Sequence, residues 1–138
     1  MRQDRTAVAQ PIGEASEGVE PQPPVDEAVI EQLASITDGQ GYSVLGELLN
    51  AFLSGVPGRL ETLDRAAAAG DMAALADQAH ALTGSAASFG ARGMADLCRE
   101  LRVAAQDGDH QATKQLVDAL HAEFLRVRAW LLSFRGRT

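Results

Sequence analysis

The sequence predicts an all-α fold, an antiparallel up-down-up-down four-helix bundle with a short additional N-terminal helix. The apolar content of 46% comes mainly from Ala and Leu, and only 4% of residues are aromatic, a composition that favours helices over strands. Apolar residues recur at intervals of three and four, the pattern of amphipathic helices. The segments between these patterns are short, so successive helices are expected to run antiparallel.

Residues 1–24 are expected to form a disordered tail or linker, and residues 25–138 a single helical domain. The first segment holds four of the five prolines of the chain and no apolar periodicity. It suits a plain chain end as well as a tether to another domain. The sequence therefore leaves open whether the protein is free-standing or part of a larger one.

The first two predicted helices precede Gly70. Asp26 is expected to cap a short helix over residues 27–35, because its side chain accepts hydrogen bonds from free N–H groups of the first turn. A long helix is expected over residues 43–69. One apolar stripe persists on both sides of Pro57, so we expect the helix to continue through it, and two separate helices are the alternative.

Glycine and aspartate mark the turns that separate the remaining helices. In Gly70-Asp71 and Asp107-Gly108-Asp109, glycine suits a left-handed helix end and aspartate caps the next helix. Phe89-Gly90-Ala91 is expected to form a tight turn. The three predicted helices span residues 72–88, 92–107 and 111–134.

Each long helix is expected to bury one apolar face. In the helix over 43–69 this face comprises Leu45, Leu48, Leu49, Phe52, Val56, Leu60 and Leu63. In the last two helices it comprises Met94, Leu97, Cys98, Leu101, Leu116, Leu120, Phe124, Val127, Leu131 and Phe134, with Trp130 at its edge.

Charge and hydropathy exclude several function classes. The net charge of −7 argues against nucleic-acid binding, which requires clustered Lys and Arg. No apolar run approaches the roughly 20 residues of a membrane span, and no signal-peptide core is present. The single cysteine, Cys98, cannot form an internal disulfide. We expect a monomeric cytoplasmic protein.

His80 is expected to lie on the solvent side of the helix over residues 72–88. On a helical wheel it points about 140° away from the apolar face that contains Leu75, Ala79, Leu82 and Ala86. Its neighbours at three and four residues are Ala76, Asp77, Thr83 and Gly84, and Ala87 lies one turn further on.

An exposed Gly84 in the middle of a helix costs about 1 kcal/mol relative to alanine. This cost favours a functional reason for the glycine over the alternative, an incidental surface histidine. A histidine above a patch of small side chains is accessible to a reactive group on another protein.

The pattern His-x-Leu-x-Gly-Ser-Ala that begins at His80 is followed by Gly90-Ala91, Leu97-Cys98 and Leu101. This arrangement resembles the signature of histidine-containing phosphotransfer (HPt) domains, and the resemblance covers about residues 25–133. It implies that His80 accepts a phosphoryl group from an aspartyl phosphate on a receiver domain and passes it to another. The implied partners are the receiver domain of a response regulator and a hybrid sensor histidine kinase.

The residues present agree with a carrier rather than a kinase. Neutral imidazole is a nucleophile near pH 7, and phosphoryl transfer needs mainly positioning and charge neutralisation. The chain has no phosphate-binding glycine loop and no kinase motifs, so we expect no ATP-dependent activity. We expect no cofactor or metal in this protein and Mg²⁺ on the partner, which is expected to dock on Ala76, Thr83, Gly84 and Ala87.

Thr83, Gly84 and Arg102 are the predicted support for a phosphoryl group on His80. The family usually has Lys at the position of Thr83, and often Glu or Gln at the position of Arg102. We hypothesise that the cation missing at Thr83 is supplied by Arg102. The alternative is a solvated arginine whose stem covers Leu101.

Two other function classes are alternatives to the phosphorelay carrier. A helical adaptor that binds a receiver or kinase without phosphorylation is the main alternative, because Thr83 carries no charge. A four-helix metal or cofactor protein is disfavoured, since no Glu and His pairs recur at the spacing such sites need. His110 is expected at a helix start, His121 on a solvated face and Cys98 in the core.

Overall fold

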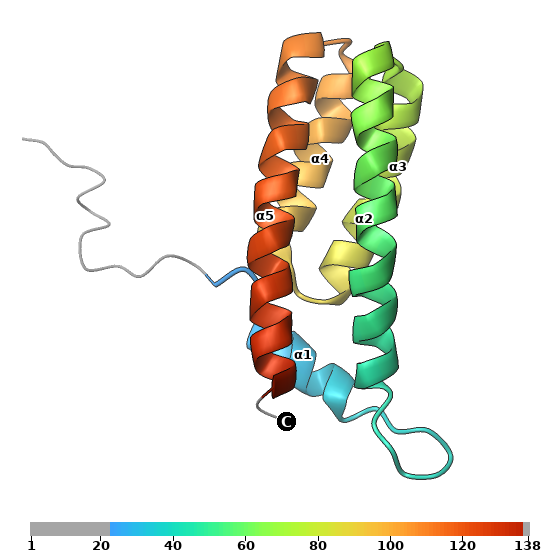
Figure 1. Ribbon diagram of the computed structural model, residues 1–138, viewed down its shortest axis with the longest axis vertical. Coiled ribbons are helices and arrows are strands. Elements are labelled where there is room, and N and C mark those ends of the chain that lie inside the picture. Colours follow the sequence, from blue (N-terminus) through green and yellow to red (C-terminus); the bar gives the residue numbers. More distant parts are fainter. Residues whose placement is uncertain (1–22, 137–138) are drawn as a thin grey trace, which may run out of the picture.

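The computed structural model of the protein describes residues 23–136, and this part of the chain contains five helices and no strand. The tail predicted for residues 1–24 lies almost entirely outside the described residues. Figure 1 shows the helices, which are α1 (Glu27–Ala34), α2 (Leu45–Ala69), α3 (Met72–Ser88), α4 (Arg92–Gln106) and α5 (His110–Gly136).

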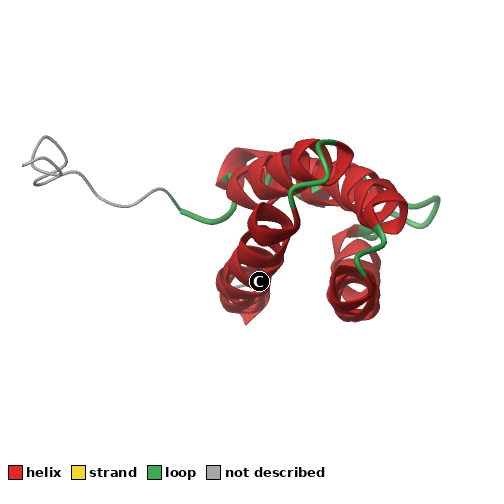
Figure 2. Cartoon of the chain, turned by 90° about the horizontal axis from the view of Figure 1, so that it is seen from above, coloured by secondary structure: helices red, strands yellow, loops and turns green. Residues whose placement is uncertain are grey.

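The four long helices form the predicted antiparallel bundle. Helix α3 packs against α2 and α4, and α5 packs against α4 and α2, so that the four helices enclose one core. Figure 2 shows them nearly end-on around that core. Helix α1 crosses the lower end of the bundle in Figure 1 and contacts α2. The short helix therefore covers one end, as predicted.

The predicted caps account for most helix boundaries. The Asp26 side chain accepts a hydrogen bond from the Ala28 N–H, and Asp71 accepts one from the Ala74 N–H. Gly70 adopts a left-handed conformation with φ 68° at the end of α2. Helix α2 runs unbroken through Pro57. It begins at Leu45 rather than at the predicted residue 43, because the Ser43 hydroxyl accepts a hydrogen bond from the Leu45 N–H before the helix starts.

Apolar faces of all five helices build the core. Phe89 stacks at a tilt on Phe52 of α2, with 4.7 Å between ring centroids. The prediction that Leu48 is buried is wrong, because 37% of it is exposed at the rim of a groove between α2 and α3. Leu97 and Leu116 are only partly buried, since they lie at the edges of their helices' buried faces.

Within residues 23–136, no helix is both long and apolar enough to cross a membrane. The longest of them, α5, has 27 residues and carries charged side chains such as Glu123, Arg126 and Arg128.

Candidate functional site

Helix α3 has one fully buried face and one exposed face. Leu75, Ala79, Leu82 and Ala86 have no exposed surface, and these residues fix the rotation of the helix against the rest of the bundle. His80 is exposed on the other side. The predicted orientation of His80 is therefore confirmed.

The four close neighbours of His80 on α3 provide no positive charge and little bulk. Ala76 and Thr83 are half-buried, and Asp77 and Gly84 are exposed. The Thr83 hydroxyl donates a hydrogen bond to the Ala79 carbonyl oxygen at 2.8 Å. Its proton is thus engaged with the helix backbone, as is common for threonine within helices. The sequence analysis named Thr83 as a support for the phosphoryl group and did not predict this bond to the backbone.

Gly84 is not required by the packing of the bundle. A Cβ atom added to it would meet no atom within 4 Å, apart from its own helix backbone and chain neighbours. Its carbonyl oxygen accepts a hydrogen bond from the Ser88 hydroxyl, which a larger residue at this position would also allow. An alanine would therefore fit at position 84, and the packing of the bundle does not explain why this residue is a glycine.

A shallow hollow of about 400 Å³ extends the exposed face of α3 towards α4 and α1. Ala87 of α3, Ala95 and Arg99 of α4 and Val29 of α1 lie around it. The Arg99 guanidinium forms an ion pair with Asp96 at 2.8 Å. Sequence reasoning named one residue of α4 for this site but missed these contributions of α1 and α4, because they depend on which helices pack side by side.

Arg102 is exposed on α4. Among the residues that the structure describes, it forms no hydrogen bond or ion pair with another side chain. Its predicted role beside His80 stays a prediction.

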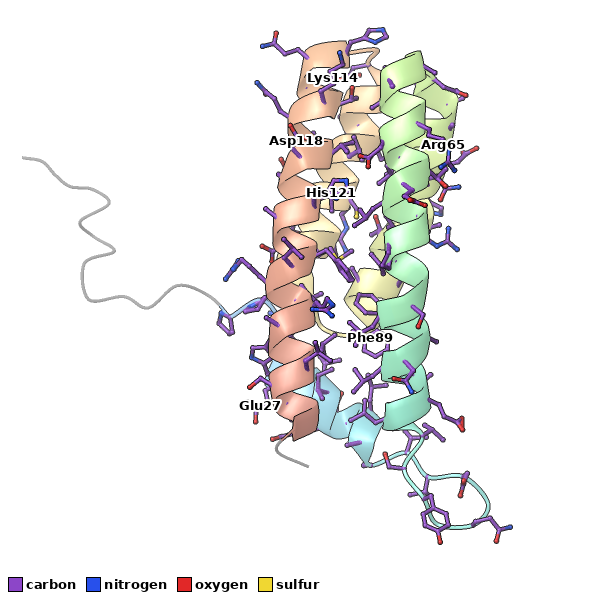
Figure 3. All side chains as sticks on the ribbon, viewed as in Figure 1. Glu27, Arg65, Phe89, Lys114, Asp118 and His121 are labelled. Atoms are coloured by element: carbon purple, nitrogen blue, oxygen red, sulfur yellow. The ribbon has the colours of Figure 1, made fainter. Side chains whose placement is uncertain are left out.

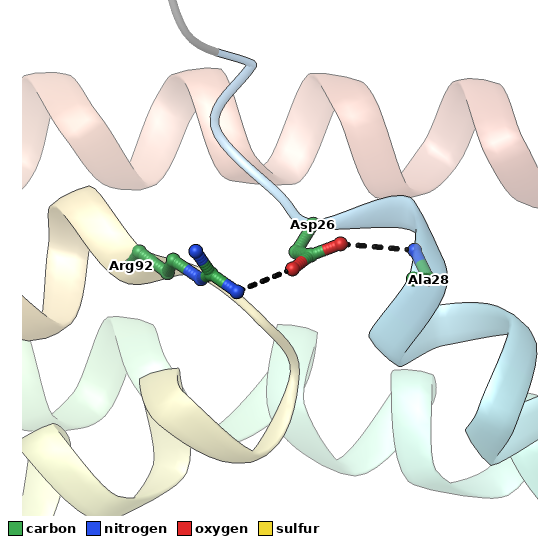
Figure 4. A network of polar contacts seen from close by, with 3 residues as sticks. All are labelled: Asp26, Ala28 and Arg92. Carbon is green, nitrogen blue, oxygen red and sulfur yellow. Dashed lines mark hydrogen bonds and ion pairs between the residues drawn. The ribbon is translucent and has the colours of Figure 1, made fainter.

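The start of α1 is fastened to the turn between α3 and α4. Asp26 forms an ion pair with Arg92 at 2.6 Å, while its other carboxylate oxygen caps α1 (Figure 4). The Asp26 N–H also donates to the Gly90 carbonyl oxygen at 2.9 Å. Gly90 has φ 71°, and a Cβ there would lie 3.0 Å from the Val29 Cβ. These contacts hold the turn that sets α3 against α4.

The other two histidines both lie on α5, whereas His80 lies on α3. His110 is the first residue of α5, as predicted, and its ring lies over Gly70. His121 was predicted on a solvated face, but its Nε2 atom lies 2.8 Å from Asp64 Oδ1 on α2 (Figure 3). The sequence could not reveal this pair, because it joins residues that only the bundle brings together.

Within residues 23–136, neither the single cysteine nor the metal-ligating side chains form a second reactive centre. Cys98 is buried, and burial raises the pKa of its thiol to about 12, so the thiol stays protonated. Among residues 23–136, no group of three or more His, Cys, Asp or Glu side chains is placed to hold a metal ion.

Comparison with known proteins points to one family. The Hpt domain model matches residues 47–130, which is more than half of the chain and includes His80. The phosphorelay protein LuxU of Vibrio vulnificus, strains YJ016 and CMCP6, is 32% identical over 104 residues. This match covers 72% of this chain and 90% of LuxU.

The fold is also similar to a solved structure. The crystal structure of histidine-containing phosphotransfer protein B (HptB) from Pseudomonas aeruginosa PAO1 matches with a TM-score of 0.78 and 30% sequence identity. The match covers 86% of this chain and 99% of HptB. Together with the LuxU match, it confirms the predicted all-α fold and the predicted class of phosphorelay carrier rather than kinase. The chain belongs to the Hpt domain family of histidine-containing phosphotransfer proteins.

Proposed function

We propose that His80 is the phosphoacceptor of this protein and exchanges phosphoryl groups with aspartate residues of receiver domains. The observation that supports this most directly is an exposed imidazole above small side chains, with open space over Gly84. This arrangement gives a partner's reactive group access to the ring without any movement of the bundle. The protein then contributes a positioned nucleophile, which is the main requirement of phosphoryl transfer.

The reaction is a displacement at phosphorus. A lone pair on an unprotonated nitrogen of the His80 imidazole forms the N–P bond. The P–O bond to the partner's aspartate breaks, and its electron pair remains on the freed carboxylate. Transfer onward reverses these steps on the next receiver domain. We propose that the partner holds the Mg²⁺ that neutralises the transferring phosphoryl group, because such charge must be offset in the transition state.

The proposed docking surface comprises Ala76, Thr83, Gly84 and Ala87 around His80. Its members are small or half-buried, so a partner surface can approach the α3 backbone closely. We further propose that the protein acts as a cytoplasmic monomer on a response regulator or a hybrid sensor histidine kinase, without nucleic acid as a partner and without membrane insertion.

A second function, a helical adaptor that binds a receiver without accepting phosphate, is favoured by one observation. The Thr83 hydroxyl donates to the Ala79 carbonyl oxygen, and no positive charge lies within one turn of His80 on α3. An adaptor needs the docking surface but no charge beside the histidine.

Intact-mass measurement separates the two functions. The protein is mixed with a receiver domain phosphorylated on aspartate, in the presence of Mg²⁺, and the complex is followed by titration calorimetry in parallel. A carrier gains the mass of one phosphoryl group as the receiver loses it. Formation of the complex without any gain in mass would instead establish the adaptor.

A further inference from the structure

A phosphoryl group on His80 adds negative charge that no cationic side chain of α3 offsets. A protein-bound phosphoryl group carries a charge of about −1.5 to −2 at neutral pH. The α3 residues nearest to His80 offer no cation, and Asp77 among them is an acid. The Thr83 hydroxyl already donates to the backbone. Neutralising charge within this protein must therefore come from a neighbouring helix.

The register of α3 against α4 places Arg102 level with His80. Ala87 and Ala95 line the same hollow, so these two positions face each other across the antiparallel pair. His80 lies seven residues before Ala87, and Arg102 lies seven residues after Ala95. Seven residues are about two turns and return to the same face of a helix. Because α3 and α4 run in opposite directions, both steps lead to the same level of the bundle.

Arg102 is also available to bind an anion. Arg99, one turn before it, is already paired with Asp96. Arg102 is exposed, and its side chain makes no ion pair or hydrogen bond within the described part of the chain. Packed helices lie about 8–10 Å apart, a gap that an extended arginine side chain can span. Its planar guanidinium presents paired donors that match phosphoryl oxygens.

We propose that Arg102 binds the phosphoryl group on His80 from the neighbouring helix and prolongs the lifetime of the phosphohistidine. This inference rests on the proposed role of His80. The guanidinium offsets the negative charge of the phosphoryl oxygens. It also opposes protonation of the imidazole, which is the leaving group when water hydrolyses the N–P bond. Both effects slow hydrolysis without blocking transfer to a receiver.

Chemical phosphorylation tests this role without any receiver domain. Phosphoramidate transfers its phosphoryl group to imidazole as its own P–N bond breaks and ammonia leaves. The ³¹P NMR signal of phosphorylated His80 is assigned by its absence in His80→Gln, and its decay is then followed after removal of the reagent. We expect Arg102→Ala to shorten the lifetime about tenfold or more, the effect of losing one hydrogen-bonded charge.

Three variants make the result specific. Arg102→Lys restores most of the lifetime, because it keeps the positive charge. Thr83→Lys combined with Arg102→Ala also restores it, since the cation then comes from α3. Arg99→Ala removes the same charge one turn away and leaves the lifetime unchanged.

An unchanged lifetime in Arg102→Ala, or an equal loss in Arg99→Ala, would overturn the proposal. Failure of the proposed function has a different signature, because a receiver would then transfer nothing to His80 although phosphoramidate still labels it.

Discussion

The two faces of helix α3 differ in how far the packing of the bundle explains their residues. On the buried face, Leu75 and Leu82 fill the core and have no exposed surface. On the exposed face, His80 is exposed to solvent, and open space lies over Gly84. Packing explains every residue of the first face and leaves the second unexplained. The residues that the fold does not need are therefore the ones to examine for function.

Two glycines, one within α3 and one in the turn that follows it, show the same contrast. Gly90 has a positive φ, and an added Cβ would press on Val29 and on the Asp26 backbone. Gly84 is helical, and an added Cβ would meet nothing. The turn between α3 and α4 requires its glycine, whereas α3 would be more stable without Gly84.

The largest expected effect on stability comes from the buried face. Leu82→Ala should lower the free energy of unfolding by about 2–5 kcal/mol, because it removes a fully buried side chain and leaves a cavity. Leu125→Ala on α5, where 65% of the leucine is exposed, is the matched control and should change it by less than about 0.5 kcal/mol. Urea denaturation measures both. Similar losses in the two variants would contradict the description of the core.

The largest expected effect on activity without loss of stability comes from the exposed face. Gly84→Leu should lower the rate of transfer from a phosphorylated receiver about a hundredfold, since the side chain displaces the reacting groups. The fold should persist because the site is open. Ala122→Leu adds the same side chain to an exposed position on α5, which lies diagonally across the bundle, and should leave the rate unchanged. A normal rate in Gly84→Leu would show that clearance is not the reason for the glycine.

The two glycines should respond to alanine with opposite signs. Gly90→Ala should destabilise the protein by about 1–2 kcal/mol from its left-handed conformation alone, with a further loss from the contact with α1. Gly84→Ala should stabilise it by up to about 1 kcal/mol. Thermal unfolding of both variants measures the difference, and a destabilised Gly84→Ala would mean that the fold does require this glycine.

The last expected effect appears only at high pH and concerns the buried nucleophile, Cys98. Burial raises its pKa from 9.0 to about 12, so the folded state holds the thiol proton more tightly than the unfolded state does. The stabilisation is complete below pH 9 and is lost as the pH rises towards 12. The stability advantage of the wild type over Cys98→Ala should therefore shrink over this range in urea titrations. Rapid reaction of native Cys98 with a maleimide at pH 8 would contradict its burial.

Sequence patterns predicted what depends on local chemistry. The Gly70-Asp71 turn fixed the start of α3, and the apolar spacing from Leu75 to Ala86 fixed its rotation and hence the exposure of His80. The pairs Asp26–Arg92 and His121–Asp64 were not predictable in this way. Each joins residues far apart in the sequence, so it depends on how the helices pack.

The residues of the site also divide into features set by local sequence and features set by how the helices pack. The Thr83 hydroxyl bonds to its own helix, a local preference that the residue type alone already suggests. The hollow between Ala87, Ala95 and Val29 needs three elements in contact, and no single periodicity reveals it. Leu48 was predicted to be buried because it belongs to the apolar residues of α2 that recur at helical spacing. The face of α2 that is actually buried is narrower than this set of residues, and Leu48 lies outside it.

The most direct test of His80 as the carrier uses all three histidines of the chain. Wild type, His80→Gln, His110→Gln and His121→Gln are each incubated with a receiver domain carrying labelled aspartyl phosphate and Mg²⁺. The proposed mechanism predicts acid-labile, base-stable label on every protein except His80→Gln. Label that persists on His80→Gln and disappears from another variant would contradict it.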